Sequence, residues 1–163
     1  MTVTETRAEP RVEFPAGFLI GAATSAHQVE GGNVNSTWWA WEHRPGADVE
    51  VPSGDAADSY HRWEDDLDLV AELGLDAYRF SIEWARIELA PGEFSKAALA
   101  HYRRMIDGAA ARGIEPVVTL HHFTEPRWFA RAGGWRATDA VARFVGYVER
   151  VAGILQPVRW VVT

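Results

Sequence analysis

Short hydrophobic segments alternate with amphipathic segments along this chain, and that order constrains its fold more than any other feature. Strands are predicted from short apolar or alternating runs at 18–24, 76–83, 114–121 and 158–163. Helices are predicted from apolar residues spaced by three or four at 58–74, at 95–113 and from 138 onward. The helix-to-strand links are short and the strand-to-helix links are long. This pattern is typical of a parallel sheet built from right-handed crossovers.

Each predicted helix has one apolar face that should pack against the sheet. The three faces comprise Tyr60, Trp63, Leu67 and Val70 in the first helix, Leu99, Tyr102, Ile106 and Ala109 in the second, and Val141, Phe144, Val145, Val148 and Val151 in the third. Ser95 is suited to cap the second helix, and Gly74 and Gly113 are suited to end the first two.

Two parallel α/β architectures fit this order. Four β/α units would form the first half of a (β/α)₈ barrel, which typically needs about 250 residues, whereas an open four-stranded sheet would need no further chain. Along the second strand, Arg79, Ser81 and Glu83 alternate with apolar residues 78, 80 and 82, which are expected to pack against the helices. A polar strand face suits either a barrel interior or an edge strand, so both architectures stay open at this point.

Composition excludes several classes of function. The net charge is −7 and Lys96 is the only lysine, so no basic run is present to bind nucleic acid. Cysteine is absent, which excludes disulfides, thiolate nucleophiles and cysteine-ligated metals. Residues 1–13 form a polar leader before a single domain at 14–163, and no apolar run reaches the ~18 residues of a membrane helix. We therefore expect a cytoplasmic protein without a membrane partner.

The strand ends carry the candidate binding residues, because βα loops hold the functional groups in such folds. His121 and His122 close the third strand but should point to opposite faces, so no metal site is expected. His122 could bind a polar substrate or form a structural hydrogen bond. Gln28 and Glu30 follow the first strand, where an amide could bind neighbouring hydroxyls or simply form a turn.

Most of the eight tryptophans also fall in these loops or at strand ends, namely Trp38, Trp39, Trp41, Trp84, Trp128 and Trp135. Indole rings offer platforms for sugar rings, but long loops also need large side chains for small cores of their own. The glycines match neither a dinucleotide fingerprint nor a P-loop, so neither nucleotide cofactor is expected.

Five segments, in order and at similar spacing, resemble glycoside hydrolase family 1, the β-glucosidase and β-galactosidase family. They are residues 18–31, which include Ser25-Ala-His-Gln-Val-Glu-Gly31, and residues 58–66, 73–87, 122–126 and 133–135. The resemblance implies a (β/α)₈ TIM barrel. It also implies a retaining hydrolysis of O-glycosyl bonds by a nucleophilic glutamate and an acid/base glutamate about 5 to 5.5 Å apart. We expect no metal or other cofactor.

The resemblance assigns roles to four residues of this chain. Gln28 is similar to the family's glutamine that binds the far hydroxyls of the glycone, and His122 to its strand-three histidine that binds a glycone hydroxyl. Phe123 stands where the family commonly has a substrate-binding tryptophan, and Arg79 resembles the arginine that keeps the nucleophile ionised. Glu83 departs from the family, in which serine is usual, and its role is left open.

The two catalytic glutamates of the family lie in an Asn-Glu-Pro motif after strand four and a later Glu-Asn-Gly motif, and these 163 residues contain neither. The resemblance places both glutamates beyond Thr163. We therefore expect the N-terminal half of a β-glycosidase barrel, truncated after strand four, with no catalytic residue and no activity alone. Its expected partners are a β-glycoside or sugar and either the C-terminal half of the barrel or a second copy. The alternatives are a non-catalytic sugar-binding or self-associating half-barrel module, or a small α/β enzyme of another class that uses His122.

Overall fold

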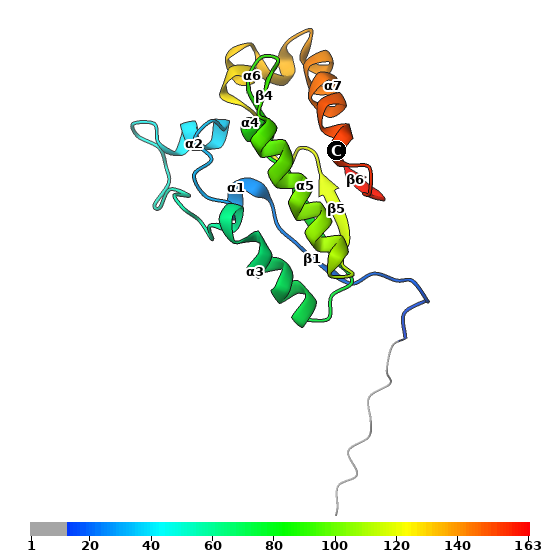
Figure 1. The fold of residues 1–163 in the computed structure, drawn as a ribbon. Coiled ribbons are helices and arrows are strands. Elements are labelled where there is room, and N and C mark those ends of the chain that lie inside the picture. Colours follow the sequence, from blue (N-terminus) through cyan, green and yellow to red (C-terminus); the bar gives the residue numbers. More distant parts are fainter. Residues whose placement is uncertain (1–12) are drawn as a thin grey trace, which may run out of the picture.

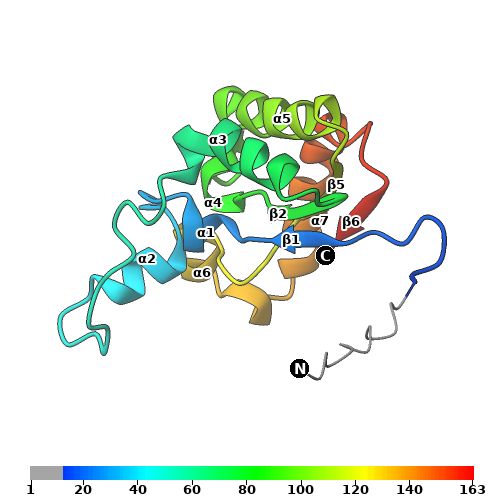
Figure 2. The same ribbon diagram turned by 90° about the horizontal axis from the view of Figure 1, so that it is seen from below.

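The computed structural model describes residues 13–163, and its centre is a four-stranded parallel sheet (Figures 1 and 2). The sheet order is β1 (Gly21–Ala23), β2 (Ala77–Ser81), β5 (Glu115–Thr119) and β6 (Trp160–Val162). The strands are shorter than predicted but lie in their predicted places. Their order in the sheet follows the chain without a reversal, so crossovers of one hand place the connecting helices on one side, as in a barrel. The polar leader, apart from Glu13, lies outside the described residues.

Three long helices cover one face of this sheet (Figure 2). They are α3 (Ser59–Glu72), α5 (Lys96–Ala111) and α7 (Ala140–Val151). Tyr78 and Phe80 of β2 are buried among side chains that include Leu67 of α3 and Ile106 of α5. The alternation predicted along the second strand is therefore confirmed on its apolar side.

Local signals set the helix ends and the strand spacing. The Ser95 hydroxyl accepts a hydrogen bond from the Ala98 N–H at 3.1 Å, which caps α5 as predicted. Gly113 has a φ of +73°, the left-handed conformation that ends a helix at low cost. Gly21 is required for another reason. A Cβ at this position would lie 2.3 Å from the carbonyl oxygen of Ala77 on β2.

The buried face of the third long helix differs from the prediction. Val141 and Val145 were expected inside, but they are 72% and 45% exposed. The prediction holds for Val151, which is fully buried, and for Phe144 and Val148, which pack against the core. Tyr147, which was not predicted, is also fully buried, and its hydroxyl donates to the Leu120 carbonyl at 3.0 Å. An aromatic ring with a hydroxyl that reaches a backbone acceptor fills more of the core than a valine, so Tyr147 is buried while Val141 and Val145 are exposed.

The long links are structured, which hydrophobic periodicity did not predict. They contain α1 (Ala26–Val29), α2 (Thr37–Glu42), α4 (Trp84–Ile87), β3 (Glu88–Ala90), β4 (Glu93–Phe94), α6 (Arg127–Arg131) and the 3₁₀ turn η1 (Gly134–Arg136). A second 3₁₀ turn, η2 (Ala152–Ile154), directly follows α7. Trp84 is 1% exposed, stacks on Tyr147 with ring centroids 5.0 Å apart, and lies 4.7 Å from the Phe129 ring. This tryptophan is therefore a core residue.

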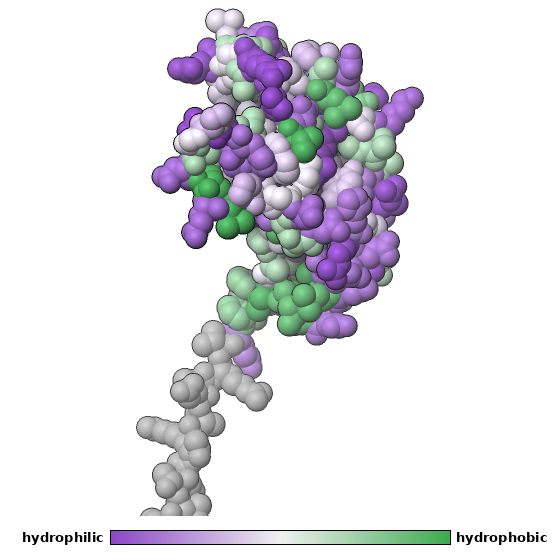
Figure 3. All heavy atoms as spheres, turned by 90° about the vertical axis from the view of Figure 1, so that its left-hand side faces the viewer, coloured by the Kyte–Doolittle hydropathy of each residue, from purple (hydrophilic) through white to green (hydrophobic). Residues whose placement is uncertain are grey.

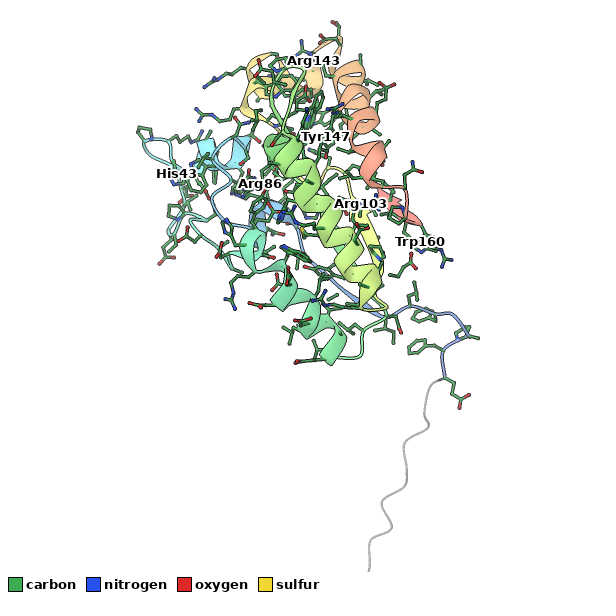
Figure 4. All side chains as sticks on the ribbon, in the orientation of Figure 1. His43, Arg86, Arg103, Arg143, Tyr147 and Trp160 are labelled. Atoms are coloured by element: carbon green, nitrogen blue, oxygen red, sulfur yellow. The ribbon has the colours of Figure 1, made fainter. Side chains whose placement is uncertain are left out.

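The face of the sheet opposite the helices and the outer edge at β6 stay open. Arg79 and Val117 on that face are half-buried, and Trp160 on β6 is 52% exposed (Figure 4). The segment 14–20 before β1 exposes several apolar side chains, which gather beside the start of the described chain (Figure 3). No helix among residues 13–163 is long and apolar enough to cross a bilayer.

Candidate sugar-binding site

A pocket of about 450 Å³ is lined mainly by the link that follows β1, and Phe123 from the link after β5 completes it. Its lining includes Gln28 and Phe123, two of the predicted substrate-binding residues, together with His27, Trp38 and Trp41. The rings of Trp38 and Phe123 meet edge to face with centroids 5.3 Å apart. Aromatic rings beside an amide match the chemistry of a sugar, which has apolar faces and a rim of hydroxyls.

Gln28 is exposed on the short helix α1, whose position depends on β2. The Ala26 N–H at the start of α1 donates to the Ser81 hydroxyl at 2.7 Å, and both residues are buried. The Gln28 Oε1 accepts a hydrogen bond from Ser25. The amide nitrogen of Gln28 is thus the group with both protons available to a ligand.

His122 and Arg79 lie beside this pocket rather than in its lining. The His122 ring is partly exposed and meets Phe123 with centroids 5.5 Å apart. Partial burial lowers the pKa of His122 below its ordinary value of 6.5, and the charge of Arg79 lowers it further, which favours the neutral ring at pH 7. Arg79 is half-buried on the open face of the sheet, where its Nη1 donates to the Thr24 carbonyl at 2.7 Å.

The two adjacent histidines have different surroundings. The Nε2 of His121 lies 3.6 Å from Glu125 Oε1, and its ring meets Trp135 edge to face, whereas His122 faces Phe123. Residues 13–163 contain no group of three His, Cys, Asp or Glu residues that could hold a metal ion.

Thr163, beyond which both catalytic glutamates are expected, directly follows the last residue of β6. Its side chain is exposed and is absent from the lining of the pocket that contains Gln28. The position of the two glutamates after it stays a prediction.

Glu83 is 2% exposed and accepts hydrogen bonds from three directions. Its carboxylate binds Asn33 Nδ2 at 2.9 Å, the Thr124 hydroxyl at 2.8 Å and the Ala85 N–H at 3.1 Å. Burial raises the pKa of this carboxyl group, and the three donors oppose that rise by stabilising the charged form. Asn33 also contacts Nδ1 of His27 at 3.2 Å. Sequence reasoning singled out neither Asn33 nor Thr124, because isolated amides and hydroxyls in loops carry no periodic signal.

A second buried carboxylate, Glu30, connects the end of α1 to Arg86 of α4, which Figure 4 labels, and to Tyr102 of α5. Arg86 Nε donates to Glu30 at 2.7 Å, the Tyr102 hydroxyl donates at 3.0 Å, and the guanidinium lies 4.3 Å from the Tyr60 ring centroid. Burial raises the pKa of Glu30 to about 7, although the charge of Arg86 acts in the opposite direction. Glu30 is therefore a structural residue that anchors the Gln28 segment.

The loops that follow β1 and β5 are joined directly. Ser36 and Pro126 form an isolated antiparallel bridge, and the Thr37 hydroxyl donates to Glu125 Oε2 at 2.9 Å. Burial alone would raise the pKa of Glu125, but contacts with His121, Thr37 and Trp135 outweigh it and lower the pKa. The two walls of the pocket therefore form one connected unit.

The remaining loop tryptophans divide between the two roles considered for them. Trp128 and Trp135 pack in the same aromatic cluster as Trp84, with ring centroids 6.0 Å and 6.2 Å from it. Trp39 stacks on His43 at 4.2 Å, outside the pocket lining. Only Trp38 and Trp41, of the tryptophans in the described part of the chain, line the pocket that contains Gln28.

Comparison with known proteins connects this geometry to a group of enzymes. The family model described as Glycosyl hydrolase family 1 matches residues 11–163. A coniferin beta-glucosidase of Pinus contorta is 43% identical over 147 residues, which are 85% of this chain and 29% of that protein. A bifunctional beta-D-glucosidase/beta-D-fucosidase of Bifidobacterium breve is 40% identical over 153 residues, 87% of this chain and 33% of that protein. The chain spans about a third of the length of the curated relatives it matches.

Solved structures show the same correspondence. The beta-glycosidase BGL167 superposes with a TM-score of 0.86 at 51% identity, over 88% of this chain and 34% of that chain. The beta-glycosidase from Pyrococcus horikoshii gives 0.85 at 42% identity, over 91% and 34%. A rice beta-glucosidase, solved in a covalent complex with Glc, gives 0.87 at 36% identity, over 92% and 33%. The predicted first part of a (β/α)₈ barrel is confirmed, and the open-sheet architecture is excluded.

Proposed function

Because the chain belongs to glycosyl hydrolase family 1, we propose that it forms part of the glycone-binding wall of a retaining β-glycosidase. The observation that carries this proposal is the shared pocket of Gln28, Trp38 and Phe123, with His122 at its edge. In this proposal Gln28 and His122 bind glycone hydroxyls and Phe123 packs against the sugar. Arg79, on the open face of the sheet, supports an ionised nucleophile supplied by the rest of the barrel.

We also propose that these 163 residues bind sugar but do not hydrolyse glycosides. Retaining hydrolysis needs one carboxylate as nucleophile and a second as acid/base, about 5 to 5.5 Å apart. Neither family motif that carries these glutamates occurs in the sequence up to Thr163. Of the carboxylates near the site, Glu83 and Glu30 are buried and hydrogen-bonded within the chain, so neither is free to attack a sugar.

Calorimetry with glucose and an aryl β-glucoside tests the binding half of the proposal. Gln28→Ala should weaken binding, whereas Gln156→Ala should not, because Gln156 is an exposed glutamine outside the pocket lining. An equal effect of both substitutions would contradict the assignment of Gln28.

A chromogenic assay with the same aryl β-glucoside tests the inactivity. Turnover by the pure chain that is abolished by substitution of Glu83 would show that a carboxylate present here is catalytic. Absence of turnover, together with binding, is the expected outcome.

A self-associating half-barrel is the second candidate, and the open edge at β6 favours it. Trp160, Val161 and Val162 are all more than 40% exposed, and unpaired edges pair readily with other strands. Sedimentation velocity distinguishes a monomer from a dimer, and a concentration-independent monomer would exclude this candidate.

The main proposal also includes a cytoplasmic location, because a sequence without cysteine is compatible with a reducing compartment. Fractionation of the producing cells tests this location.

A further inference from the structure

One wall of the sugar-binding pocket is backed by a continuous row of buried polar groups. Glu83, Asn33 and His27 are 2%, 2% and 4% exposed, and they contact one another in that order. Glu83 comes from the end of β2, whereas Asn33 and His27 come from the link after β1. The row therefore connects two neighbouring β/α units behind the pocket.

Glu83 sets the orientation of the Asn33 amide. The Asn33 Nδ2 donates to Glu83 Oε2 at 2.9 Å, so the amide nitrogen is the atom on the side of Glu83. The same nitrogen lies 3.2 Å from His27 Nδ1. An amide NH₂ carries two protons and accepts none, so it donates one proton to each neighbour. The hydroxyl of Ser36 lies 3.4 Å from the same Nδ1 and can donate to it as well.

This orientation fixes the tautomer of His27. Because Nδ1 accepts, the proton of the neutral ring must be on Nε2. Burial lowers the pKa of His27, which keeps the ring neutral. The Nε2 atom is buried and has no nitrogen or oxygen partner among residues 13–163.

The aromatic rings of the pocket pack on the His27 ring. The His27 ring meets Phe123 at a centroid distance of 5.8 Å and an interplanar angle of 81°, and Trp38 at 6.4 Å and 68°. Edge-to-face contacts of this kind place an electropositive ring edge or N–H against an electron-rich face. A protonated Nε2 suits this environment better than a lone pair does.

Glu83 also binds the residue that follows Phe123 in the loop after β5. Its carboxylate accepts from the hydroxyl of Thr124, the residue next to Phe123, at 2.8 Å. One buried carboxylate thus holds the loop that carries Phe123 and, through Asn33, the histidine on which Phe123 and Trp38 pack.

We propose that Glu83 is a positioning residue that fixes the Nε2–H tautomer of His27 through Asn33 and thereby places Trp38 and Phe123 against the sugar. Glu83 does not touch the sugar in this arrangement. The inference rests on the proposed function only for the ligand, since the tautomer and the ring placement exist in the free chain.

Two-bond ¹⁵N–¹H spectra of the imidazole rings at pH 7.5 give the first test, because they distinguish the two tautomers. The His27 signal is assigned by its loss in His27→Phe. The expected result is an Nε2–H tautomer in the unsubstituted chain. An Nδ1–H tautomer, or a fast mixture of both, would overturn the proposal without any substitution in the row.

The second test compares Glu83→Met with Glu88→Met. Glu88 is also a buried carboxylate, 5% exposed, but it binds Trp84 Nε1 and the Gly92 N–H away from the pocket row. Loss of Glu83 frees Asn33 to turn its Oδ1 toward His27, so the Nδ1–H form should gain population. The Glu88 variant should keep the native tautomer.

Calorimetry with an aryl β-glucoside completes the comparison. Glu83→Met should weaken binding about fivefold, the scale of one aromatic contact, and Glu88→Met should leave it unchanged. Equal weakening of binding by both variants would overturn the proposal, because it would show that Glu83 only stabilises the fold. If Glu83→Met does not fold, Asn33→Ala gives the same readouts while Thr124 and Ala85 keep their acceptor. If neither the unsubstituted chain nor any variant binds the glucoside, the proposed function fails. The tautomer measurement then still decides whether Glu83 fixes the tautomer of His27.

Discussion

Substitution of Arg86 by methionine should destabilise the chain far more than loss of an exposed arginine. Arg86 is the only cation bonded to Glu30 among the described residues, at 2.7 Å, and the Glu30 side chain is 4% exposed. Without Arg86 the carboxylate would keep only the Tyr102 hydroxyl as a side-chain donor. Removing one partner of a buried pair costs about 3 to 5 kcal/mol, a large part of the ~5 to 15 kcal/mol that stabilises a typical domain.

The pH dependence of this loss follows from the pKa of Glu30. The folded-state pKa of about 7 lies above the ordinary value of 4.5, so the folded chain binds more protons between these values. Stability from this group is therefore highest below pH 4.5 and falls as the pH rises through 7. Loss of Arg86 removes the charge that lowers this pKa, so Arg86→Met should be less damaging at pH 5, where Glu30 can take up a proton.

Urea and thermal unfolding followed by tryptophan fluorescence measure the effect at pH 5 and pH 7.5. For a chain of this size the expected decrease in Tm at pH 7.5 is about 6 to 20 °C. Arg103→Met is the matched control, because Arg103 pairs with Asp107 at 2.8 Å on the surface and should contribute less than about 1 kcal/mol. A loss for Arg86→Met that equals the control, or that is the same at both pH values, would refute the reasoning.

Three further substitutions test other parts of the fold. Gly21→Ala should cost several kcal/mol in urea unfolding, because its Cβ would meet the Ala77 carbonyl at 2.3 Å; wild-type stability would show that β1 can shift freely. Ser95→Ala should cost about 1 kcal/mol by removing the acceptor of the Ala98 N–H, and a change below about 0.3 kcal/mol would contradict the cap. Burial lowers the pKa of His101 to about 4 from 6.5, so the unfolded chain binds its proton first and stability falls as the pH drops from 6.5 to 4. His101→Phe should flatten the stability profile in that range, and an unchanged acid slope would refute this assignment.

The sequence predicted the repeating frame of the fold because strand and helix periods are set by contacts with a single core. The cap at Ser95 and the buried side of β2 follow from rules that act within one element. The face of α7 was predicted only in part: Val151 is buried, whereas Val141 and Val145 are exposed. Tyr147 is buried as well, because its hydroxyl reaches an acceptor, the Leu120 carbonyl, 27 positions away. No local pattern contains that information.

The candidate site could likewise be predicted only in part from the sequence. The resemblance to a known family pointed to Gln28 and Phe123, and the structure brings both to one pocket. The support behind them, Asn33 and Thr124, could not be predicted, because each depends on a partner about 40 to 50 positions away, at Glu83. Single polar residues in loops acquire a role only when the tertiary fold supplies the other half of the hydrogen bond.

The bridge between the loops after β1 and β5 has a consequence for the order of folding. Its hydrogen bond from Thr37 to Glu125 joins residues 88 positions apart. Contacts of such long sequence separation carry a high loop-closure entropy and form after local helices and neighbouring strand pairs. The pocket should therefore close late, and recovery of ligand binding during refolding should lag behind recovery of helical circular dichroism.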